Sequence, residues 1–331
     1  MIVTVTVNAS LDRTYTIGSV ALGQVNRALS DTVEAGGKGI NVSRALHAAG
    51  VATLAVLTAG GCEGEQLRAL LGDERLPHLL VPTKAPTRTN ITVAEPGRTT
   101  KMNAPGHALT PEDYETLVGA VAQQARGARW VVISGSVPPG APDDLVPRLV
   151  AAAREAGARS AVDASGAALR TAVDAAPELL APNLDELAEL TARSLAGTGR
   201  VPVDEALDDA MTVSRRTGSA LLVSLGEAGA LWVDCTKRGD RMWHAAAPPV
   251  IPVNTVGAGD ALLAGWLAGD QQEDGPDDAP ARLARAVAWG TAACLMPGTA
   301  GNVAARADVA AVTVTELTTT AAFRHLSKTS R

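Results

Sequence analysis

The chain has 331 residues, a formal net charge of −6 and a hydrophobic fraction of 46%. This length suits one large α/β domain or two smaller ones, and because aromatic residues make up only 2% of the chain, the core must be aliphatic. The acidic balance argues against nucleic acid or an anionic membrane surface as the main partner. An anionic substrate would therefore be bound by a few well-placed cations.

The cysteines and the amino-terminal segment exclude further classes of protein. The cysteines are odd in number and widely separated, so neither a disulfide framework nor a zinc site is predicted, and we expect buried free thiols at Cys62, Cys235 and Cys294. Residues 1–7 alternate like a β-strand and lack the regions typical of a signal peptide. No apolar run reaches the roughly 18 residues of a membrane span. These features predict a cytoplasmic protein.

Polar residues that follow the first predicted strand give the first candidate for a binding site. The strand at residues 2–7 leads into the segment 8–12, where Asp12 is either a ligand-binding residue or a turn residue. Open α/β sheets bind ligands at the carboxyl ends of their strands. Residues 13–34 and about 84–104 alternate like short strands, which predicts one small β-sheet set apart from the main body. We expect this sheet to act as a lid, with edges that a second subunit would cover to form a homodimer.

A glycine-rich turn opens the first predicted helix. The sequence Gly-Gly-Lys-Gly at 36–39 is neither a Walker loop nor a G-x-G-x-x-G fingerprint, because glycine follows the lysine. Lys38 and Asn41 suit a charged, hydroxylated ligand, and the alternative for Lys38 is a solvated residue at a helix start. The glycines at 60, 61 and 64 are expected to form a loop before a helix at 65–71.

From about residue 108 the pattern becomes a regular alternation of strands and helices. We expect strands at 130–134, 160–162 and 220–224, helices at 111–126, 145–156, 204–217 and 282–296, and a hairpin of 231–233 with 241–244. This alternation predicts a mostly parallel sheet whose polar loops gather along one rim. Residues 270–280 are predicted to form a solvated acidic loop, and the polar tail from about 317 is expected to fray.

The strongest chemical signal lies at residues 254–260. Gly257, Ala258 and Gly259 precede Asp260 and an apolar helix, and a glycine turn at a helix start offers amide groups and a positive dipole to an anion. An anion would repel the carboxylate of Asp260 unless this carboxylate removes a proton from a nucleophile. The segment therefore predicts phosphoryl transfer to a substrate hydroxyl. Taken alone, it could also be a glycine turn capped by aspartate.

Several of these motifs together resemble one family. Residues 254–260 resemble the second signature of the PfkB (ribokinase-like) carbohydrate kinases, residues 36–42 resemble the first, and Asn183 with Glu186 resembles the N-x-x-E motif. The similarity runs from residue 8 to about residue 302. The chain is most similar to the hexose-phosphate branch of the family through residues 8–12, 87–90, 133–140 and 223–230, and residues 100–106 look most like the 1-phosphofructokinase version.

The resemblance implies a ribokinase-like three-layer α/β/α domain over residues 1–316, with a mostly parallel central sheet, the small β-sheet as its lid and a polar tail at 317–331. It implies ATP-dependent phosphorylation of a ketohexose phosphate, with ATP and Mg²⁺ as cofactors. The first choice of acceptor is fructose 1-phosphate, and tagatose 6-phosphate and fructose 6-phosphate are alternatives. A catalytically silent sugar-phosphate sensor is the alternative from another class. The intact Asp260 argues against such a sensor.

The resemblance also implies a role for each matched residue. Asp260 would be the base, and the amide groups of Gly257, Ala258 and Gly259 would stabilise charge on the transferred phosphoryl group. The acceptor would be bound by Asp12, Gly37, Lys38, Asn41, Arg88, Asn90, Asn103 and Ser136, with Lys38, Arg88 and Ser136 on its phosphate. The nucleotide would be bound by Asn183, Ser224, Gly226 and Gly229, and Glu186 would act on Mg²⁺ and its waters. The chain departs from the branch at Ala104 and Ala181, where relatives often carry glutamate and lysine.

Overall fold

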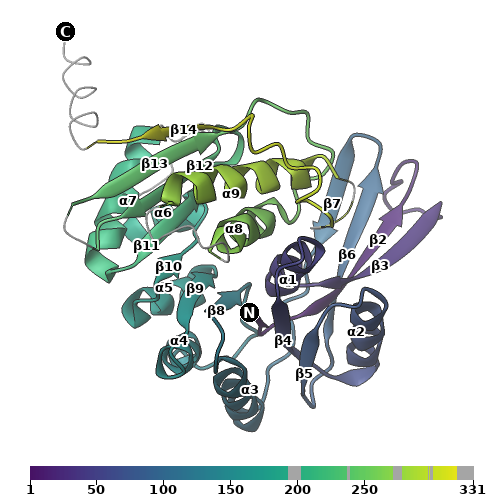
Figure 1. The fold of residues 1–331 in the computed structure, drawn as a ribbon. Coiled ribbons are helices and arrows are strands. Elements are labelled where there is room, and N and C mark those ends of the chain that lie inside the picture. The colour runs from purple at the N-terminus through teal and green to yellow at the C-terminus, as the bar shows by residue number, and fades with distance from the viewer. Residues whose placement is uncertain (193–202, 237–238, 271–277, 297, 299–300, 319–331) are drawn as a thin grey trace.

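The structure is a computed structural model that describes residues 1–192, 203–236, 239–270, 278–296, 298 and 301–318 (Figure 1). Within these residues, a ten-stranded sheet lies between two layers of helices, and a separate four-stranded sheet projects beside it. The predicted three-layer α/β/α arrangement with a small additional sheet is thus confirmed. No helix among the described residues is long and apolar enough to cross a membrane.

The large sheet is parallel through its centre and antiparallel at one edge. Its order is β14 (Thr313–Glu316), β13 (Arg241–Ala246), β12 (Ala230–Asp234), β11 (Ala220–Ser224), β10 (Leu179–Leu180), β9 (Arg159–Asp163), β8 (Trp130–Ser134), β1 (Ile2–Thr6), β4 (Thr53–Ala59) and β5 (His78–Pro82). Strand β1 is buried along its whole length, as its run of β-branched residues favours for a strand covered on both faces. The parallel strands from β5 to β11 all end at the same rim, which is where the loops of the predicted site meet.

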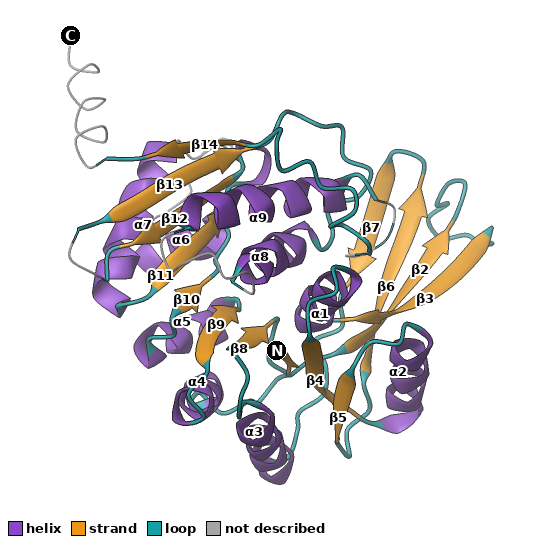
Figure 2. Ribbon diagram, viewed as in Figure 1, coloured by secondary structure: helices purple, strands orange, loops and turns teal. Residues whose placement is uncertain are grey.

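Helices cover both faces of this sheet (Figure 2). One face carries α1 (Lys38–Ala48), α8 (Ala258–Gly269) and α9 (Ala279–Cys294), and the other carries α3 (Pro111–Gln124), α4 (Leu145–Glu155), α5 (Gly166–Ala175), α6 (Leu184–Thr191) and α7 (Val203–Thr217). Helix α8 is apolar on all sides and is buried from its third residue to its last, because α1, α9 and the sheet surround it. This central helix holds Asp260 in its first turn.

The small sheet has the strand order β3 (Ser30–Gly36), β2 (Ser10–Thr16), β6 (Arg88–Glu95) and β7 (Arg98–Met102). It combines the two segments that the alternating patterns singled out, although they lie more than fifty residues apart in the chain. Helix α2 (Gly61–Asp73) packs beside β3. The small sheet is therefore confirmed, whereas its motion as a lid remains a prediction.

Several elements differ from the sequence-based expectations. Helix α2 begins at Gly61, so Gly61 and Gly64 are helical rather than in a loop. A Cβ at residue 64 would lie 3.1 Å from the carbonyl carbon of Ala59, so the glycine permits close packing of α2 on β4. Cys62 is exposed and Cys235 and Cys294 are only partly buried, so the expectation of buried thiols was wrong. Most of the predicted acidic loop (271–277) and of the polar tail (319–331) lies outside the described residues.

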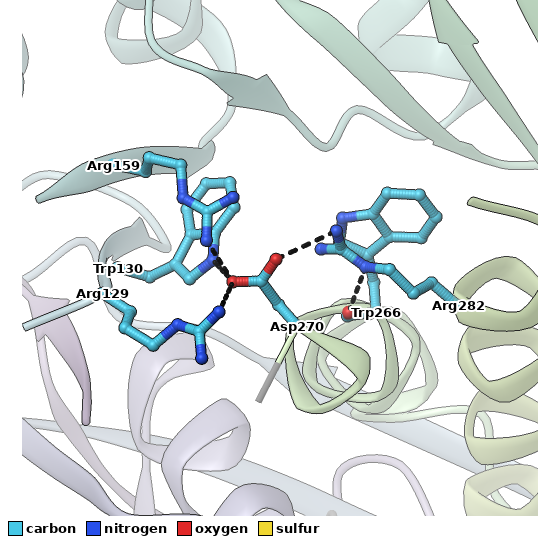
Figure 3. Close-up of polar contacts among 6 residues, drawn as sticks. All are labelled: Arg129, Trp130, Arg159, Trp266, Asp270 and Arg282. Carbon is cyan, nitrogen blue, oxygen red and sulfur yellow. Dashed lines mark hydrogen bonds and ion pairs between the residues drawn. The ribbon is translucent and has the colours of Figure 1, made fainter. Parts of the chain in front are cut away.

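A charged cluster at the amino ends of β8 and β9 anchors the far end of α8 (Figure 3). Asp270 follows α8 directly and accepts hydrogen bonds from Trp130 Nε1 at 2.9 Å and from Arg282 at 3.1 Å. Oδ2, the oxygen that Trp130 contacts, also accepts a hydrogen bond from Arg159 and pairs with Arg129 at 3.4 Å. Burial lowers the pKa of Arg282 to about 10, despite the nearby Asp270. One carboxylate thus ties α8 and α9 to two strands of the sheet.

Candidate active site

A cavity of about 1070 Å³ opens between the rim of the large sheet and one face of the small sheet. Its wall includes side chains from the loops after β1, β8, β9 and β10, from strand β11, from the starts of α1, α6 and α8, and from all four strands of the small sheet. All the predicted site residues line this cavity except Ala258, Gly226 and Gly229. The structure therefore gathers residues from positions 12 to 260 in one place, as the rim rule for α/β sheets predicts.

Asp260 is almost fully enclosed, with 5% of its surface exposed, and it still lines the cavity. Its Oδ2 accepts a hydrogen bond from Asn41 Nδ2 at 2.8 Å. Gly257 caps the helix with φ 78°, a left-handed conformation that glycine adopts at no steric cost. A Cβ at Gly259 would meet no other protein atom within 4 Å, so packing does not require a glycine there. The absent side chain instead leaves space for a ligand beside the first turn, where the amide of Ala258 also donates to the carbonyl oxygen of Thr255 at 3.4 Å.

The surroundings of Asp260 raise its pKa to about 7. The largest cause is its removal from water, and the second is the negative charge of Asp163. Lys38, Asn41 and Arg44 act in the opposite direction without cancelling these effects. A carboxylate with a pKa near neutrality is suited to accept a proton from a substrate hydroxyl at physiological pH.

Lys38 and Asp163 form an ion pair across the rim that the sequence analysis missed. Lys38 Nζ lies 2.7 Å from Asp163 Oδ1, and Ser134 Oγ donates to Asp163 Oδ2 at 2.9 Å. Burial disfavours the ammonium group, but the attraction of Asp163 outweighs this effect and raises the pKa of Lys38. Lys38 therefore stays charged in the cavity wall. The position of Asp163 at the end of β9 was the one signal that could have identified it.

The acceptor side of the cavity is built around Asp12. Asp12 Oδ1 accepts hydrogen bonds from Asn90 Nδ2 and from Ser10 Oγ, both at 2.8 Å. Asp12 and Asn90 lie opposite each other on the adjacent strands β2 and β6. A Cβ at Gly36 would lie 2.3 Å from the carboxylate of Asp12, and Gly37 has φ 136°. The two glycines of the first signature thus make room for Asp12 and turn the chain into α1.

Arg88 carries a second cation into the same wall. Its Nη1 donates to the carbonyl oxygen of Ala104 at 2.6 Å, and Asn90 Oδ1 accepts from the amide of Ala104 at 3.1 Å. Arg88 Nε is buried and has no hydrogen-bond partner among the described residues. Burial lowers the pKa of Arg88, although Asp12 opposes this effect. The guanidinium group therefore keeps donor capacity for an anion.

Ser136 and Asn103 complete this side of the cavity. Ser136 Oγ accepts a hydrogen bond from Asn8 Nδ2 at 3.2 Å, and the same amide donates to the carbonyl oxygen of Pro105 at 3.0 Å. The loops that follow β1, β7 and β8 are thus fastened together. The hydroxyl proton of Ser136 remains free to donate to a ligand.

Asn183 and Glu186 form a reciprocal capping box at the start of α6. Asn183 Oδ1 accepts from the amide of Glu186, and Glu186 Oε2 accepts from the amide of Asn183, both at 2.9 Å. Burial raises the pKa of Glu186. No cluster of three or more metal-ligating side chains occurs among the described residues. The side chains of Asn183 and Glu186 offer oxygen atoms as metal ligands. Oxygen ligands fit Mg²⁺, an ion that keeps several waters and takes few protein ligands.

The glycines predicted to bind the nucleotide have local structural explanations. A Cβ at Gly229 would lie 1.9 Å from the carbonyl oxygen of Ala245, and φ is 90° there, so the turn between β11 and β12 requires glycine. Gly226 opens a short 3₁₀ turn with φ 62°. Ser224, by contrast, lines the cavity and pairs with Asn183 through a parallel bridge. A nucleotide role for Gly226 and Gly229 remains a prediction.

Comparisons with known proteins agree with this geometry. A 1-phosphofructokinase of Bacillus subtilis (strain 168) is 34% identical over 269 residues, which cover 81% of this chain and 85% of the relative. A crystal structure of phosphofructokinase-2 from Escherichia coli in complex with fructose-6-phosphate has a TM-score of 0.80 and 32% identity, covering 92% of this chain and 97% of that one.

A structure of a ribokinase from Arabidopsis thaliana shows the same fold, with a TM-score of 0.69 and 19% sequence identity. The match covers 94% of this chain and 96% of the ribokinase chain. The predicted ribokinase-like fold is therefore confirmed. The model of the family described as pfkB family carbohydrate kinase matches residues 6–305. This match spans most of the chain and includes both glycine-rich segments of the cavity. The chain therefore belongs to the pfkB family of carbohydrate kinases.

Proposed function

We propose that the chain transfers the γ-phosphoryl group of MgATP to a ketohexose phosphate, with fructose 1-phosphate as acceptor and fructose 1,6-bisphosphate as product. Its general activity, ATP-dependent phosphorylation of a sugar phosphate, follows from family membership. The observation that carries the finer proposal is the enclosed Asp260 in the first turn of α8, with the cations Lys38 and Arg88 in the same cavity wall.

In the proposed reaction, Asp260 accepts the proton of the acceptor hydroxyl, and the hydroxyl oxygen attacks the γ-phosphorus. The bond from the γ-phosphorus to the bridging oxygen breaks, and ADP leaves with the electron pair. The amide groups of Gly257, Ala258 and Gly259 at the start of α8 stabilise the charge on the transferred group. Mg²⁺, when bound beside Glu186, would neutralise charge on the nucleotide phosphates.

The acceptor side of the cavity supports a sugar that already carries a phosphate. Arg88 and Lys38 provide two positive charges, and Ser136 provides a hydroxyl donor. Asp12, Asn90 and Asn103 are suited to sugar hydroxyls because they offer both donors and acceptors. A neutral sugar would make no charge-assisted contact with Arg88, or with Lys38 beside its partner Asp163, and would therefore bind more weakly.

Tagatose 6-phosphate and fructose 6-phosphate remain alternative acceptors. The same cations can meet a phosphate at either end of a ketohexose, and the structural relative from Escherichia coli was crystallised with fructose-6-phosphate. Resemblance to the 1-phosphofructokinase version at residues 100–106 and the relative from Bacillus subtilis both favour fructose 1-phosphate. A catalytically silent sensor is disfavoured, since such a protein would have no use for an enclosed carboxylate with one donor.

The test is a side-by-side measurement of kcat/KM with MgATP for fructose 1-phosphate, tagatose 6-phosphate, fructose 6-phosphate and fructose. We expect fructose 1-phosphate to exceed fructose by a factor of several hundred, because a charge-assisted phosphate site contributes several kcal/mol. Substitution Arg88→Ala should reduce this factor for the phosphorylated acceptors and leave the value for fructose nearly unchanged. Preference for a neutral sugar would refute the phosphate site.

The proposed homodimer rests on the small sheet. The loop between β2 and β3 exposes Leu22, Val25 and Leu29, whose exposed fractions are 91%, 82% and 76%. Exposed apolar side chains beside open strand edges are suited to contact with a second copy of the sheet. Light scattering at micromolar concentration tests this proposal, and the mass of a single chain would count against it.

A further inference from the structure

The geometry points to Arg44 on α1 as a positioning residue that orients Asn41 and, through Asn41, the catalytic base Asp260. This inference rests on the proposed function of Asp260. Arg44 does not line the cavity, so its role would be exerted through the side chain that it contacts. It would couple the base to Glu74, which follows α2, and to Ala35 near the end of the small-sheet strand β3.

Asn41 uses both ends of its amide group. Arg44 Nη1 donates to Asn41 Oδ1 at 2.8 Å, and Asn41 Nδ2 donates to Asp260 Oδ2 at 2.8 Å. An amide can be rotated by half a turn about its last bond, which would exchange oxygen and nitrogen. Arginine can only donate, so its contact requires that the oxygen of Asn41 faces Arg44. The nitrogen must then face Asp260, where it is the donor that a carboxylate needs.

Arg44 is itself held by charged and main-chain partners. Its Nε and Nη2 donate to the two carboxylate oxygens of Glu74 at 2.7 Å and 2.9 Å. Its Nη2 also donates to the carbonyl oxygen of Ala35 at 2.9 Å. The side chain of Arg44 is 13% exposed and that of Glu74 is 33% exposed. This forked pairing fixes the plane of the guanidinium group and with it the direction of Nη1.

Loss of Arg44 would act on Asp260 in two ways. The amide of Asn41 would be free to turn its oxygen towards the carboxylate, which would remove a hydrogen bond and add repulsion. A positive charge would also be lost from the surroundings of Asp260, which otherwise contain Asp163 on β9 and Lys38 on α1. Both changes disfavour the ionised carboxylate. The base would be displaced and would need a higher pH to ionise.

A purely structural role for Arg44 makes a different prediction. If Arg44 serves only to join α1 to α2, its removal lowers the melting temperature but leaves the pH dependence of the reaction unchanged. A positioning role instead lowers kcat and shifts the acidic limb of the pH profile. The two roles are separated by measuring both properties on the same variants.

The experiment compares Arg44→Gln, Arg44→Lys and Glu74→Gln with the control Arg68→Gln. Arg68 forms an exposed ion pair with Glu65 on α2, and the side chains are 54% and 74% exposed. For each variant, kcat, KM for MgATP, the pH profile of kcat/KM and the melting temperature are measured with the preferred acceptor.

For Arg44→Gln we expect kcat to fall by roughly 10- to 100-fold, the range produced by misplacement of a reacting group. KM for MgATP should stay within about twofold, and the acidic limb should move to higher pH. Arg44→Lys should restore the acidic limb through its charge but not kcat, because lysine lacks the fork. Glu74→Gln should lower kcat by about two- to fivefold, and Arg68→Gln should leave it unchanged.

An Arg44→Gln enzyme that is folded and retains normal kcat and an unshifted acidic limb would overturn the inference. If this variant does not fold, Glu74→Gln decides the matter, and a normal kcat with an unshifted profile would count against the inference. Asp260→Asn is measured in parallel. Near-normal turnover of that variant would refute the proposed base, whereas an inactive Asp260→Asn beside fully active Arg44 variants would refute only the role of Arg44.

Discussion

Two carboxylates lie at opposite ends of the same helix, Asp260 buried and Asp270 with a side chain that is 9% exposed, and they differ in the partners that surround them. Asp260 lies in the first turn of α8, and Asp270 follows its last residue. The dipole of the helix favours a negative charge at the first position and disfavours it at the second. Yet Asp270 is the well-compensated one, with contacts from Trp130 and three arginines, whereas Asp260 receives one side-chain hydrogen bond, from Asn41.

This difference separates a group that stabilises the fold from a group that performs chemistry. Four partners around Asp270 replace the water that it loses on burial, and they join α8 and α9 to the strands β8 and β9. Asp260 loses its water without such replacement, and its pKa rises to about 7 in consequence. A carboxylate with unused acceptor capacity that lines a large cavity is available to a substrate.

The largest expected effect is the loss of turnover in Asp260→Asn. An amide cannot accept the proton of the acceptor hydroxyl, so kcat should fall by about a thousandfold or more. The melting temperature should not fall, because the substitution removes a poorly solvated charge from the interior. The two measurements are kcat with the preferred acceptor and a thermal melt. Near-normal turnover would show that the base lies elsewhere.

A second variant tests the amide groups at the start of α8. Gly259→Ala should lower kcat by roughly 10- to 100-fold, because the methyl group would enter the space that a phosphoryl group needs. The same change should stabilise the protein by about 0.5–1 kcal/mol, since alanine favours the helix and meets no other protein atom within 4 Å. Thermal melts and kinetics on one sample test both effects.

The matched control for Gly259→Ala is Gly229→Ala. Its added Cβ would lie 1.9 Å from the carbonyl oxygen of Ala245, so it should lose stability. If both variants lose stability to the same extent, the start of α8 is more tightly packed than the structure describes. If Gly259→Ala keeps full activity, the first-turn amide groups do not contact the transferred group.

At the carboxyl end of α8, a substitution of Asp270 should lower stability and leave turnover nearly unchanged. Asp270→Asn should cost about 1–3 kcal/mol of stability, because it leaves Arg282, whose side chain is 15% exposed, without its carboxylate. Arg129 and Arg159 are 45% and 43% exposed and contribute little, because water screens their charges. The kcat of Asp270→Asn should stay within about twofold of the unmodified enzyme, since Asp270 lies beside Trp130 at the amino end of β8 (Figure 3) and does not line the cavity. Urea unfolding and kinetics at a temperature well below the transition check this. A large loss of kcat in the folded variant would contradict the separation of the two ends.

The sequence predicted the central features of the site because they leave local patterns. A strand followed by polar residues indicates a site at residues 8–12, although Asp12 itself lies within strand β2 of the small sheet. A glycine turn before an apolar helix places Asp260 at a helix start. Pairings between distant residues leave no such pattern. Asp163 contacts Lys38, which lies 125 residues away in the sequence, and Arg44 contacts Glu74, which lies 30 residues away. Asp163 and Arg44 were missed for that reason.

Local structure was also missed where its usual end signals are absent. Helix α5 ends at Ala176 in a left-handed conformation, φ 49°, a position where glycine would have marked the end. Its first residue is Gly166, and glycine is a poor signal of a helix start. The capping box of Asn183 and Glu186, in contrast, follows the typical sequence pattern of a helix start.

The smallest effect expected is a pH dependence of stability at Asp260. Its folded pKa, about 7, exceeds the ordinary pKa of an aspartate, 3.8, so the folded state binds the proton more tightly than the unfolded state does. Asp260 therefore costs stability progressively as pH rises from about 4 to about 7, and this cost is constant above that range. Asparagine does not titrate, so the melting temperature of Asp260→Asn relative to the unmodified protein should be higher at pH 8 than at pH 5, by roughly 2–4 °C.

Gly259→Ala is the control for this comparison, because it adds no titratable group and its difference from the unmodified protein should be the same at both pH values. The magnitude depends on how well water enters the cavity, but its sign follows from burial alone. A difference for Asp260→Asn that is equal at pH 5 and pH 8 would mean that Asp260 ionises as an ordinary aspartate. Asp260 would then match Asp270 as a compensated group, and the contrast between the two ends of α8 would no longer explain which of them is catalytic.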